Sequence, residues 1–422
     1  MSSVTYADSP KGLSKEQLFA ALENAAAGWG SVKKVLLIPP DYTRFHSGAG
    51  MITNFYYHFF KDRAQVDILP ALGTHAPMPD AELNEMFGDI PLDRFLSHNW
   101  REDVVKLGEV PTAFVRDVSE GLIDQLIAVE LNRRLLDPSY DLILSIGQVV
   151  PHEVVGMANR NKNLFVGCGG SDMINSSHML GAFYGMERIM GKDHTPVRKV
   201  FDYAEEHFFK TAPLIYVLTV TTATENDIHI HGLFIGRERE LFERAVALSQ
   251  EKNLTFVDVP FQRVIVNLDE KEFKSTWLGN KAIYRTRMAI ADGGELFILA
   301  PGVERFGEDS AIDRLIRKYG YVGRENILKL IEENDDLRGT LSAAAHLIHG
   351  SSDGRFTITY CTQKLSKEEV EGVGFQYMPY EEALQRFWLG RCVEGFNTYS
   401  LGSGYYYISN PALGLWADRR KF

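Results

Sequence analysis

Cysteine, long apolar runs and a secretory leader are scarce or missing in this sequence, and each absence excludes a class of protein. Its three cysteines, Cys168, Cys361 and Cys392, lie far apart without paired metal-ligand spacing, which argues against a disulfide scaffold and a zinc ribbon. No apolar run approaches the roughly 20 residues that span a bilayer. The first residues lack the basic start and apolar stretch of a secretory signal. We therefore expect a cytoplasmic protein with no membrane partner.

Positive charge is also in deficit. The formal net charge of −11 would repel nucleic acid over most of the surface, so we expect no nucleic-acid partner. An anionic small molecule would have to be drawn in by a local cluster of cations. With 422 residues, 45% hydrophobic and 24% charged, the chain has the composition of a globular protein long enough for two domains.

Apolar, β-rich runs alternate with amphipathic stretches, as is typical of α/β folds. The first series predicts helices at 51–62 and 237–252 and strands at 31–41, 65–71, 140–146, 164–166 and 214–222. A second series predicts strands at 263–267, 296–300 and 356–360. The sequence thus predicts two α/β domains with largely parallel sheets. They comprise residues 1–262 and 263–394, and the Tyr/Gly-rich tail, 395–422, can rejoin the first domain.

Reactive side chains follow several of the predicted strands, at the sheet edge where open α/β sheets bind ligands. Arg44 follows the first strand, together with Asp41 and Thr43, which can orient hydroxyl or phosphate groups. Its guanidinium offers a planar fork of donors that matches a carboxylate. Arg44 is therefore the cation that an anionic substrate needs. The alternative is that it pairs with a neighbouring carboxylate as part of the scaffold.

Two histidines lie in other strand-end loops, His75 after the second strand and His152 after 140–146. Histidine is the side chain best suited to exchange protons near neutral pH, and two such bases suit a reaction at either face of one carbon. The alternative is a hydrogen-bonded structural role, since the chain has 12 histidines. His229 and His231 alternate on a strand and can bind metal on one face, but a partly exposed strand is the simpler interpretation.

A glycine-rich loop, Gly167 to Gly170, follows the predicted strand at 164–166. Backbone donors around Gly169 and Gly170 can hold a phosphate, especially because a helix is expected next. The loop does not fit the Gly-x-Gly-x-x-Gly dinucleotide fingerprint, and neither does the loop after the first strand. Nicotinamide-dependent dehydrogenase chemistry is therefore disfavoured.

In this order, these motifs resemble the lactate racemase family of nickel-pincer 2-hydroxyacid racemases and epimerases. Asp41-x-Thr43-Arg44 resembles its first motif and Gly73-Thr74-His75 its second. His152, followed ten residues later by Lys162 and sixteen further on by His178, resembles its cofactor-binding segment. Trp277 to Lys281 extends the similarity into the second domain.

The resemblance implies a covalently held cofactor, pyridinium-3,5-bisthiocarboxylic acid mononucleotide nickel, the nickel pincer nucleotide. Lys162 would form its thioamide link, and His178 would complete a square-planar nickel site held otherwise by two sulfurs and a carbon. Without the flanking motifs, Lys162 would be read as a solvated loop lysine. The cofactor is made by other proteins, so cofactor-biosynthesis proteins are implied as partners.

The resemblance also implies the remaining roles. His75 and His152 would be alternating bases, each serving one enantiomer, while hydride leaves C2 and returns to the opposite face of a 2-keto acid. Arg44 would anchor the substrate carboxylate, Lys281 would polarise the reacting oxygen, and Trp277 would stack over the cofactor ring. Because both domains contribute, the resemblance implies an active site in the interdomain cleft.

Departures from the family pattern adjoin the substrate region. Leu278 replaces a polar residue, Phe45 replaces a common proline, and the run Asn159-Arg160-Asn161 replaces a glycine-rich approach to the lysine. The substrate is therefore expected to be a 2-hydroxy acid other than lactate, such as a polyhydroxy (aldonic) acid. Two alternatives remain, a cofactor carrier or binding protein without turnover and a hydride-transferring 2-hydroxyacid dehydrogenase. The sequence leaves the oligomeric state open.

Overall fold

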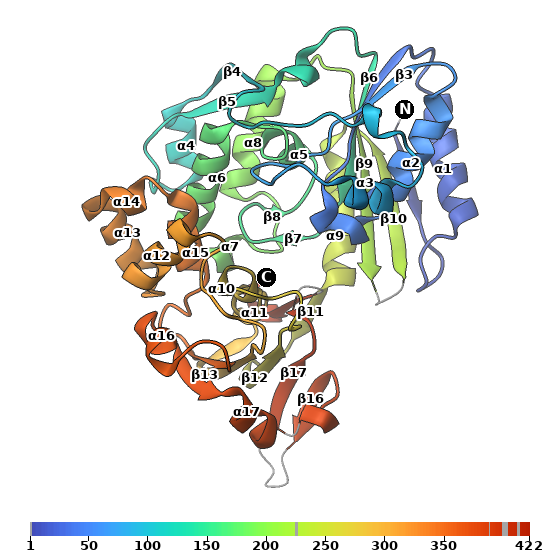
Figure 1. The fold of residues 1–422 in the computed structure, drawn as a ribbon. Coiled ribbons are helices and arrows are strands. Elements are labelled where there is room, and N and C mark those ends of the chain that lie inside the picture. Colours follow the sequence, from blue (N-terminus) through green and yellow to red (C-terminus); the bar gives the residue numbers. More distant parts are fainter. Residues whose placement is uncertain (1, 224–226, 388, 399–403, 412–413) are drawn as a thin grey trace. The chain divides into compact units, whose positions relative to one another are not determined.

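The computed structural model describes residues 2–223, 227–387, 389–398, 404–411 and 414–422 (Figure 1). They form two compact units. The first comprises Met1–Tyr184 and Ile189–Asn253, and the second comprises Gly185–Arg188 and Leu254–Phe422. Among the described residues, no helix combines the length and apolar character that a membrane crossing requires.

The helices and strands of the first unit alternate along the chain. In order they are β1 (Ser3–Tyr6), α1 (Lys15–Ala27), β2 (Lys34–Ile38), η1 (Tyr42–Ser47), α2 (Ala49–Phe60), β3 (Gln65–Ile68), α3 (Asp80–Phe87), η2 (Leu92–Arg94), β4 (Val104–Val110), α4 (Thr112–Val118), β5 (Ile127–Asn132), η3 (Arg133–Leu136), β6 (Leu142–Gln148), β7 (Pro151–His152), β8 (Gly156–Met157), α5 (Asn161–Phe165), α6 (Ser171–Tyr184), α8 (Pro196–Phe208), β9 (Leu214–Ala223), β10 (Ile228–Gly236) and α9 (Arg239–Asn253).

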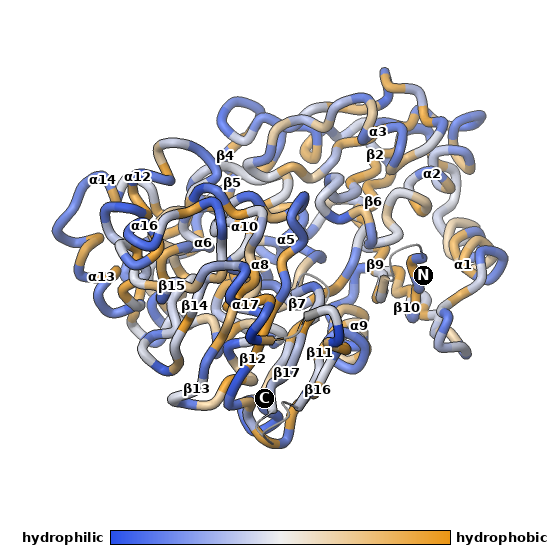
Figure 2. The backbone as a smooth tube through the Cα atoms, turned by 60° about the horizontal axis from the view of Figure 1, so that its bottom comes forward, coloured by the Kyte–Doolittle hydropathy of each residue, from blue (hydrophilic) through white to orange (hydrophobic). Residues whose placement is uncertain are grey.

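The main sheet of the first unit has the order β1-β10-β9-β6-β2-β3. Strands β3, β2, β6 and β9 are parallel, and β10 and β1 extend the sheet in antiparallel fashion. The strand β2 is a continuous apolar run because both faces of the sheet are covered (Figure 2). Val35 and Leu37 pack in one core cluster, whereas Leu36 and Ile38 pack in the other.

Helices cover the two faces of this sheet. Leu22 of α1 and Ile52 of α2 belong to the cluster of Val35, whereas Phe201 of α8 and Phe242 of α9 belong to the cluster of Leu36. Figure 1 shows α1 and α2 in blue on one side of the sheet and α8 in green on the other. Local sequence also fixes helix ends: Ser14 and Gln17 form a capping box at the start of α1.

The second unit has its own six-stranded sheet, with the order β15-β14-β13-β12-β17-β16, in which only the pairing of β16 with β17 is antiparallel. Its elements are α7 (Met186–Ile189, through residue 188), β11 (Leu254–Val257), β12 (Phe261–Asn267), α10 (Thr276–Gly279), α11 (Lys281–Thr286), β13 (Ile290–Leu299), α12 (Ser310–Tyr319), α13 (Arg324–Glu333), α14 (Asp335–Arg338), α15 (Leu341–His349), β14 (Thr357–Thr362), α16 (Lys367–Gly372), β15 (Gln376–Pro379), α17 (Tyr380–Phe387), η4 (Leu389–Arg391), β16 (Gly395–Thr398), β17 (Gly404–Ile408), β18 (Leu415–Asp418) and η6 (Arg419–Lys421). The predicted α/β class with largely parallel sheets is thus confirmed.

Three details differ from the sequence-based expectations. The units meet in the chain at Asn253 and Leu254, before the expected boundary at 262, because β11 pairs with β18 inside the second unit. The tail does not rejoin the first unit either, because its strands β17 and β18 pair with β12 and β11 of the second unit. Residues 399–403 of that tail lie outside the described residues. Residues 164–166 are no strand, since a short apolar run does not distinguish a buried strand from a buried helical turn.

Residues 185–188 belong to the second unit, and ion pairs of Glu187 explain this assignment. The Glu187 carboxylate lies 3.1 Å from Arg287 Nε, 2.6 Å from Arg355 Nη1 and 3.2 Å from Lys421 Nζ. The Arg287 side chain is only 4% exposed, so its charge requires a carboxylate partner. Glu187 therefore belongs to the ionic framework of the second unit.

Candidate active site

The first unit has a topological switch point beside β2. The chain runs from β2 to β3 on one side and later returns as β6 on the other side, and all three strands are parallel. Loops that leave such strands diverge above the carboxyl edge, where open α/β sheets bind ligands. Asp41 follows β2, His75 follows β3, and His152 follows β6. The sheet thus brings the predicted motifs to one edge.

Asp41 and His75 form a hydrogen-bonded pair at this edge. An isolated parallel bridge between Pro40 and Ala71 extends the pairing of β2 with β3 and holds the two loops side by side. The Asp41 carboxylate, which is 7% exposed, accepts from His75 Nδ1 at 2.5 Å and from Thr43 Oγ1 at 2.5 Å. Burial alone would raise the pKa of Asp41, but these two hydrogen bonds bring it below its usual value. Asp41 is thus held as a carboxylate.

Arg44 lies on η1, half-buried, and forms no ion pair with a carboxylate of the described residues. A scaffold arginine would be paired with a carboxylate, so this observation does not support that alternative, and the binding role of Arg44 stays a prediction. Its charge instead acts on its neighbours: it lowers the pKa of both Lys162 and His152. A cation held near other cations without a carboxylate partner can bind an anion.

Lys162 lies in the short helix α5. Burial is the main cause that lowers the pKa of its amine to about 8, and the charge of Arg44 adds to the effect, while Glu153 and Asp41 oppose it. Part of its surface stays accessible. The residue is therefore no solvated loop lysine: at pH 7 about a tenth of it is a neutral, nucleophilic amine, far more than for an ordinary lysine.

Asn163 anchors α5 above the switch point. Its Nδ2 donates to the Ile38 carbonyl at the end of β2 and to Ser145 Oγ on β6, both at 3.2 Å. One buried side chain thus ties the helix of Lys162 to both strands that flank the switch point. This position explains why the charge of Lys162 acts on Asp41, His152 and His178.

Residues 157–163, which include Lys162, are here called the lysine segment. Asn159 and Arg160 have left-handed φ angles of 66° and 54°. Glycine adopts this backbone freely, which explains a glycine-rich pattern at this place. Here a fully buried arginine, Arg198, holds the strained backbone, donating to the carbonyls of Met157 at 2.5 Å and Asn159 at 3.2 Å and to Asn161 Oδ1.

The polar side chains of the lysine segment are bonded to the protein itself. Arg160 lies 2.7 Å from Asp202 Oδ1 and 3.4 Å from Glu205 Oε2, and Asn161 Nδ2 donates to Asp202 at 2.6 Å. These groups are therefore committed to the scaffold. Their contacts do not support a role in binding a polyhydroxylated substrate.

His178 and His152 differ in the partner of Nδ1. On α6, His178 Nδ1 lies 2.6 Å from the Ile174 carbonyl, which leaves Nε2 without a proton in the neutral ring. His152 Nδ1 accepts from the Val154 amide at 3.1 Å. Burial lowers the pKa of both histidines. His178 thus presents a neutral imidazole nitrogen of the kind that binds transition metals.

Gly169 and Gly170 are explained by close packing. A Cβ at Gly169 would lie 1.8 Å from the Phe165 carbonyl oxygen, and one at Gly170 would lie 2.1 Å from Glu130 Oε2. The same Glu130 oxygen accepts from the Asp172 amide in the first turn of α6, at 3.2 Å. A carboxylate thus occupies the place that a phosphate would take, and the contacts do not support the expected phosphate cradle.

Trp277 and Lys281 lie in the second unit, on α10 and at the start of α11. The Trp277 ring centroid is 4.4 Å from that of His346, and Lys281 Nζ is 5.6 Å from the Phe273 ring centroid. Asn280, between them, accepts from the Tyr360 hydroxyl at 2.6 Å. The segment is therefore firmly held, and its two side chains are partly exposed.

Sequence reasoning missed Glu153, Asn163 and Arg198. Glu153 acts electrostatically on His152, Lys162 and His178, but it is a single carboxylate in a turn and carries no motif of its own. Asn163 adjoins the predicted lysine, and this position in the sequence could have indicated its role. Arg198 lies on a helix 36 positions beyond Lys162, and no local pattern announces its burial.

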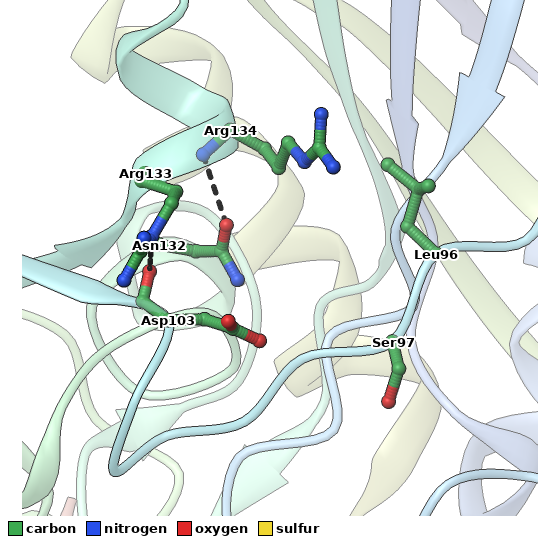
Figure 3. A pocket seen from close by; sticks show the side chains of 6 residues that line it. All are labelled: Leu96, Ser97, Asp103, Asn132, Arg133 and Arg134. Carbon is green, nitrogen blue, oxygen red and sulfur yellow. Dashed lines mark hydrogen bonds between the residues drawn. The ribbon is translucent and has the colours of Figure 1, made fainter.

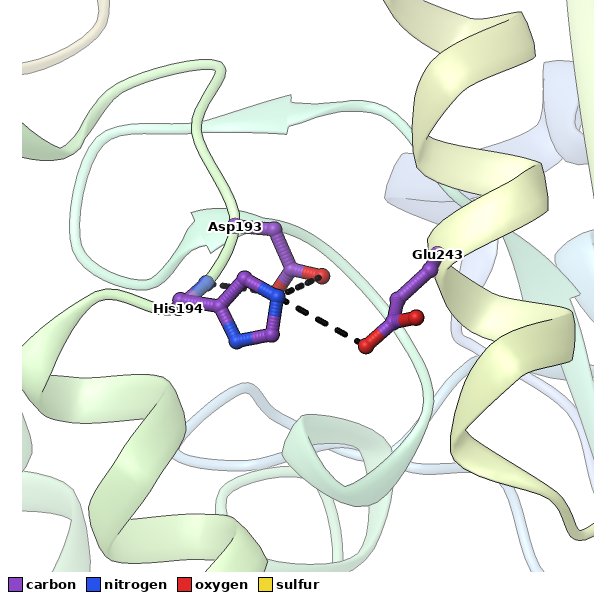
Figure 4. Close-up of side chains that lie close together, drawn as sticks. All are labelled: Asp193, His194 and Glu243. Carbon is purple, nitrogen blue, oxygen red and sulfur yellow. Dashed lines mark hydrogen bonds and ion pairs between the residues drawn. The ribbon is translucent and has the colours of Figure 1, made fainter.

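Other polar clusters have structural explanations. Asp193, His194 and Glu243 bring ligand atoms within 4.8 Å of one another (Figure 4). Arg239, however, donates to both Asp193 oxygens, at 2.7 and 2.8 Å, so this is an ion-pair cluster. His229 Nδ1 is bonded to the Lys11 carbonyl and His231 Nε2 to Thr222. These contacts agree with the simpler interpretation of the two strand histidines.

A pocket of about 280 Å³ opens elsewhere on the first unit (Figure 3). Its lining residues are Leu96, Ser97, Asp103, Asn132, Arg133 and Arg134. None of the predicted site residues lines it. In Figure 3 the Arg133 backbone is bonded to the Asp103 carbonyl, at 2.8 Å, which ties the start of η3 to the loop before β4.

Comparisons with known proteins agree with this description. Residues 15–190 match the lactate racemase N-terminal domain. The fold is similar to the crystal structure of a Thermotoga maritima protein, with a TM-score of 0.78 and 24% identity over 96% of this chain and 99% of that one. It is also similar to the lactate racemase apoprotein from Thermoanaerobacterium thermosaccharolyticum, with a TM-score of 0.68 and 17% identity over 96% and 89%.

No curated protein matches the sequence. The structural likenesses, both under 25% identity, establish the fold. The domain match covers the segment in which Asp41, Arg44, His75, His152, Lys162 and His178 lie. The first part of the chain thus matches the lactate racemase N-terminal domain, and the whole chain shares the fold of the lactate racemase apoprotein.

Proposed function

We propose that this protein is a nickel-pincer racemase or epimerase that inverts C2 of a 2-hydroxy acid. The match of residues 15–190 to the lactate racemase N-terminal domain supports a racemase-type isomerase. The observation that carries the finer proposal is the grouping, near one sheet edge, of an arginine with no carboxylate partner among the described residues, a histidine–aspartate pair, and a lysine with a lowered pKa whose charge acts on a histidine with a bare Nε2. Together these groups suffice to bind an anion, move a proton and hold a cofactor.

Lys162 and His178 fit the nickel pincer nucleotide. A neutral amine is needed to form a thioamide, and the lowered pKa of Lys162 supplies one near neutral pH. His178 Nε2 offers the neutral imidazole nitrogen that nickel accepts beside sulfur donors. When bound, the cofactor supplies the acceptor for the hydride of C2. Lys162 would hold it, and His178 would be its protein ligand.

The chain's own residues then bind the substrate and move its proton. Arg44 would hold the carboxylate by a bidentate contact. His75 Nε2 would accept the hydroxyl proton, with Asp41 orienting the ring through Nδ1. Lys281 would stabilise the oxygen on which charge changes, and Trp277 would stack on the cofactor ring. The proposal rests on the first unit and treats these two as additional contributors.

The substrate class is a 2-hydroxy acid. The polar groups of the lysine segment are bonded to the scaffold and give no preference for a polyhydroxy acid. An aldonate is therefore one candidate beside lactate, malate and aromatic hydroxy acids. Each acid of this panel is offered to the protein as one enantiomer or epimer. Chiral chromatography then measures inversion at C2. Nickel-loaded protein is used throughout.

Loading is tested independently of turnover. The chain is produced together with the cofactor-biosynthesis proteins, and intact mass and metal content are measured. Added mass on Lys162 with one equivalent of nickel supports the proposal. The absence of both after co-production contradicts it. The matched control is Lys199→Arg on α8, an exposed lysine whose replacement leaves loading unchanged.

Two other functions predict different results. A carrier without turnover would load nickel and cofactor but invert no acid in the panel. Such a protein needs no proton acceptor, and the buried Asp41 carboxylate that orients His75 speaks against it. A dehydrogenase would release the keto acid with a change in nicotinamide absorbance, yet the sequence carries no dinucleotide fingerprint.

A further inference from the structure

The pocket of Figure 3 is enclosed by three chain segments that are hydrogen-bonded to the sheet and to one another. Leu96 follows an isolated parallel bridge at the end of β3, and its amide donates to the Ile68 carbonyl at 2.7 Å. On another wall the Arg133 amide donates to the Asp103 carbonyl at 2.8 Å. The backbone around the pocket is therefore fixed before a ligand binds, which lowers the entropic cost of binding.

A buried histidine, His98, links two of these walls. Asn132, which is 1% exposed, donates from Nδ2 to His98 Nδ1 at 2.9 Å, and His98 Nε2 donates to the Gly169 carbonyl at 3.1 Å. Asn132 Oδ1 accepts from the Arg134 amide at 2.9 Å and so caps the start of η3. These buried groups are used in holding the backbone. Polar contacts to a ligand must therefore come from the other side chains that line the pocket.

Two charges of opposite sign line the pocket without pairing with each other. The Arg134 side chain is exposed and forms no hydrogen bond or ion pair with the described part of the chain. The Asp103 carboxylate accepts from the Asn99 amide at 2.9 Å and forms no ion pair with a described residue. In Figure 3 the Arg134 guanidinium points toward Leu96, and the Asp103 carboxylate points away from Arg133. Both charges are thus accessible to a ligand.

Arg133 adds a second cation to the same pocket. Its guanidinium donates to the Glu102 carbonyl at 2.6 Å and to the Asp103 carbonyl at 3.5 Å. These neutral acceptors hold the side chain in place but do not cancel its charge. Ser97 contributes a hydroxyl group and Leu96 an apolar wall. With two guanidinium groups and one carboxylate, the lining is net positive in a chain whose formal net charge is −11, and it therefore favours an anion.

The side chains around this pocket match a small oxyanion that also carries a hydroxyl group. A guanidinium binds the oxygens of a carboxylate or a phosphate through parallel N–H donors. The carboxylate of Asp103 repels a bare anion, but it accepts a hydrogen bond from a hydroxyl group of the ligand. The volume of about 280 Å³ lies just below the range of about 300–1,000 Å³ that is usual for ligand pockets. The ligand therefore has only a few carbon atoms.

We propose that this pocket is a second ligand site of the first unit and binds a small hydroxylated oxyanion, either a carboxylate or a phosphate ester. Arg134 holds the oxyanion, Arg133 adds its positive charge, and Asp103 accepts from the hydroxyl group of the ligand. This site is independent of the racemase function, because none of the residues proposed for the active site lines the pocket. Binding here can therefore be measured on the chain without cofactor.

Leu96 provides a local readout of occupancy in the full chain. Methyl spectra of protein labelled with ¹³C-methyl leucine are recorded by nuclear magnetic resonance, and the Leu96 signals are assigned by their loss in Leu96→Ile. Titration with glycerate or glycerol phosphate should shift these signals to saturation, and the compound that binds identifies the oxyanion. Propionate and propyl phosphate, which lack the hydroxyl groups, should bind at least about tenfold more weakly. Glycerol, which carries no charge, should leave the signals in place. Because glycerate is a 2-hydroxy acid, its effect on Leu96 must persist in Arg44→Met.

Three variants assign the contacts. Arg134→Met should weaken binding at least about tenfold, because it removes the guanidinium. The control Arg314→Met removes an exposed arginine of α12 in the second unit, with the same change in net charge, and should leave binding unchanged. Asp103→Asn should remove most of the preference for the hydroxylated compounds over the propyl compounds, since the repulsion and the hydroxyl acceptor are lost together. The site is refuted if neither glycerate nor glycerol phosphate shifts Leu96 to saturation, or if Arg134→Met binds them as the parent chain does. Equal binding of the propyl compounds by the parent chain would overturn the role of Asp103.

Discussion

Two regions of the first unit meet at the carboxyl edge of its sheet and differ in how their polar groups are used. The edge loops, residues 41–47 and 73–75, contain Arg44 without a carboxylate partner among the described residues, and a His75 side chain that is 58% exposed. In the lysine segment, by contrast, Asn161 and Arg160 are bonded to Arg198, Asp202 and Glu205.

The difference indicates which region meets the substrate. Polar groups left without protein partners at an accessible edge are available to a ligand, whereas buried hydrogen-bonded networks hold a backbone in one geometry. The edge loops are therefore the proposed substrate-binding region, and the lysine segment is the support that presents Lys162. Removing a group from the edge loops should therefore affect chemistry, and removing one from the support should affect the fold.

Replacing Lys162 should have the largest effect. In Lys162→Arg the positive charge stays, but no amine remains that can form a thioamide, so we expect complete loss of covalent cofactor and of any racemase activity. Intact mass after co-production with the biosynthesis proteins measures it, and Lys199→Arg is the matched control. Covalent cofactor on Lys162→Arg would place the attachment elsewhere and remove the lysine segment from the site.

Arg198→Met should break the support region through stability. The fully buried guanidinium donates to the Met157 and Asn159 carbonyls and to Asn161, and its removal leaves these acceptors unpaired around a strained backbone. We expect a loss of about 3–5 kcal/mol, a fall in Tm of roughly 10 °C for this unit. Differential scanning calorimetry measures it. The control Arg101→Met, at an exposed arginine, should change stability by less than about 0.5 kcal/mol. Equal melting of both variants would contradict a support role.

The two regions also differ in how far the sequence predicts them. Asp41, Arg44 and His75 are recognisable because each directly follows a strand, and parallel topology brings such positions together. The support could not be found in this way. Arg198 is far from Lys162 in sequence, and no glycine indicates the positive φ angles at Asn159 and Arg160. Local pattern predicts where strands end, whereas buried polar partners depend on packing.

Gly169 and Gly170 give the opposite lesson. Their sequence predicts a phosphate loop, but it rests on a strand that is the helix α5 in the structure. The glycines serve close contact with Phe165 and Glu130 instead. A run of glycines indicates that a Cβ does not fit at these positions, but the sequence does not show which neighbouring group excludes the Cβ.

Asp41→Asn should weaken chemistry with little effect on the fold. An amide at this position can donate to His75 Nδ1, which moves the ring proton to Nε2 and removes the base. By analogy with other oriented histidines, we expect kcat to fall by about 10²–10³-fold while cofactor loading is kept. Racemisation assays on loaded protein measure it. Asp67→Asn, which keeps an acceptor for the Tyr140 hydroxyl outside the site, is the control. Activity within threefold of the parent protein would show that His75 needs no orienting carboxylate.

The reactivity of Lys162 should show the smallest but most direct difference, and the unloaded chain suffices to measure it. With a pKa of about 8, the amine is largely protonated at pH 6, half neutral near pH 8 and almost fully neutral at pH 10. Labelling by a small amine reagent should therefore rise through pH 8. At pH 7 the neutral fraction exceeds that of an ordinary lysine, with a pKa near 10.4, by about 10²-fold.

Competitive labelling followed by peptide mass spectrometry, with exposed Lys199 as the internal reference, gives the apparent pKa. Arg44→Met then links the two regions. Because the Arg44 charge lowers the pKa of Lys162, its removal should shift the labelling curve to higher pH. An unchanged curve would mean that burial alone sets the lysine, and that the edge loops and the lysine segment are electrostatically independent.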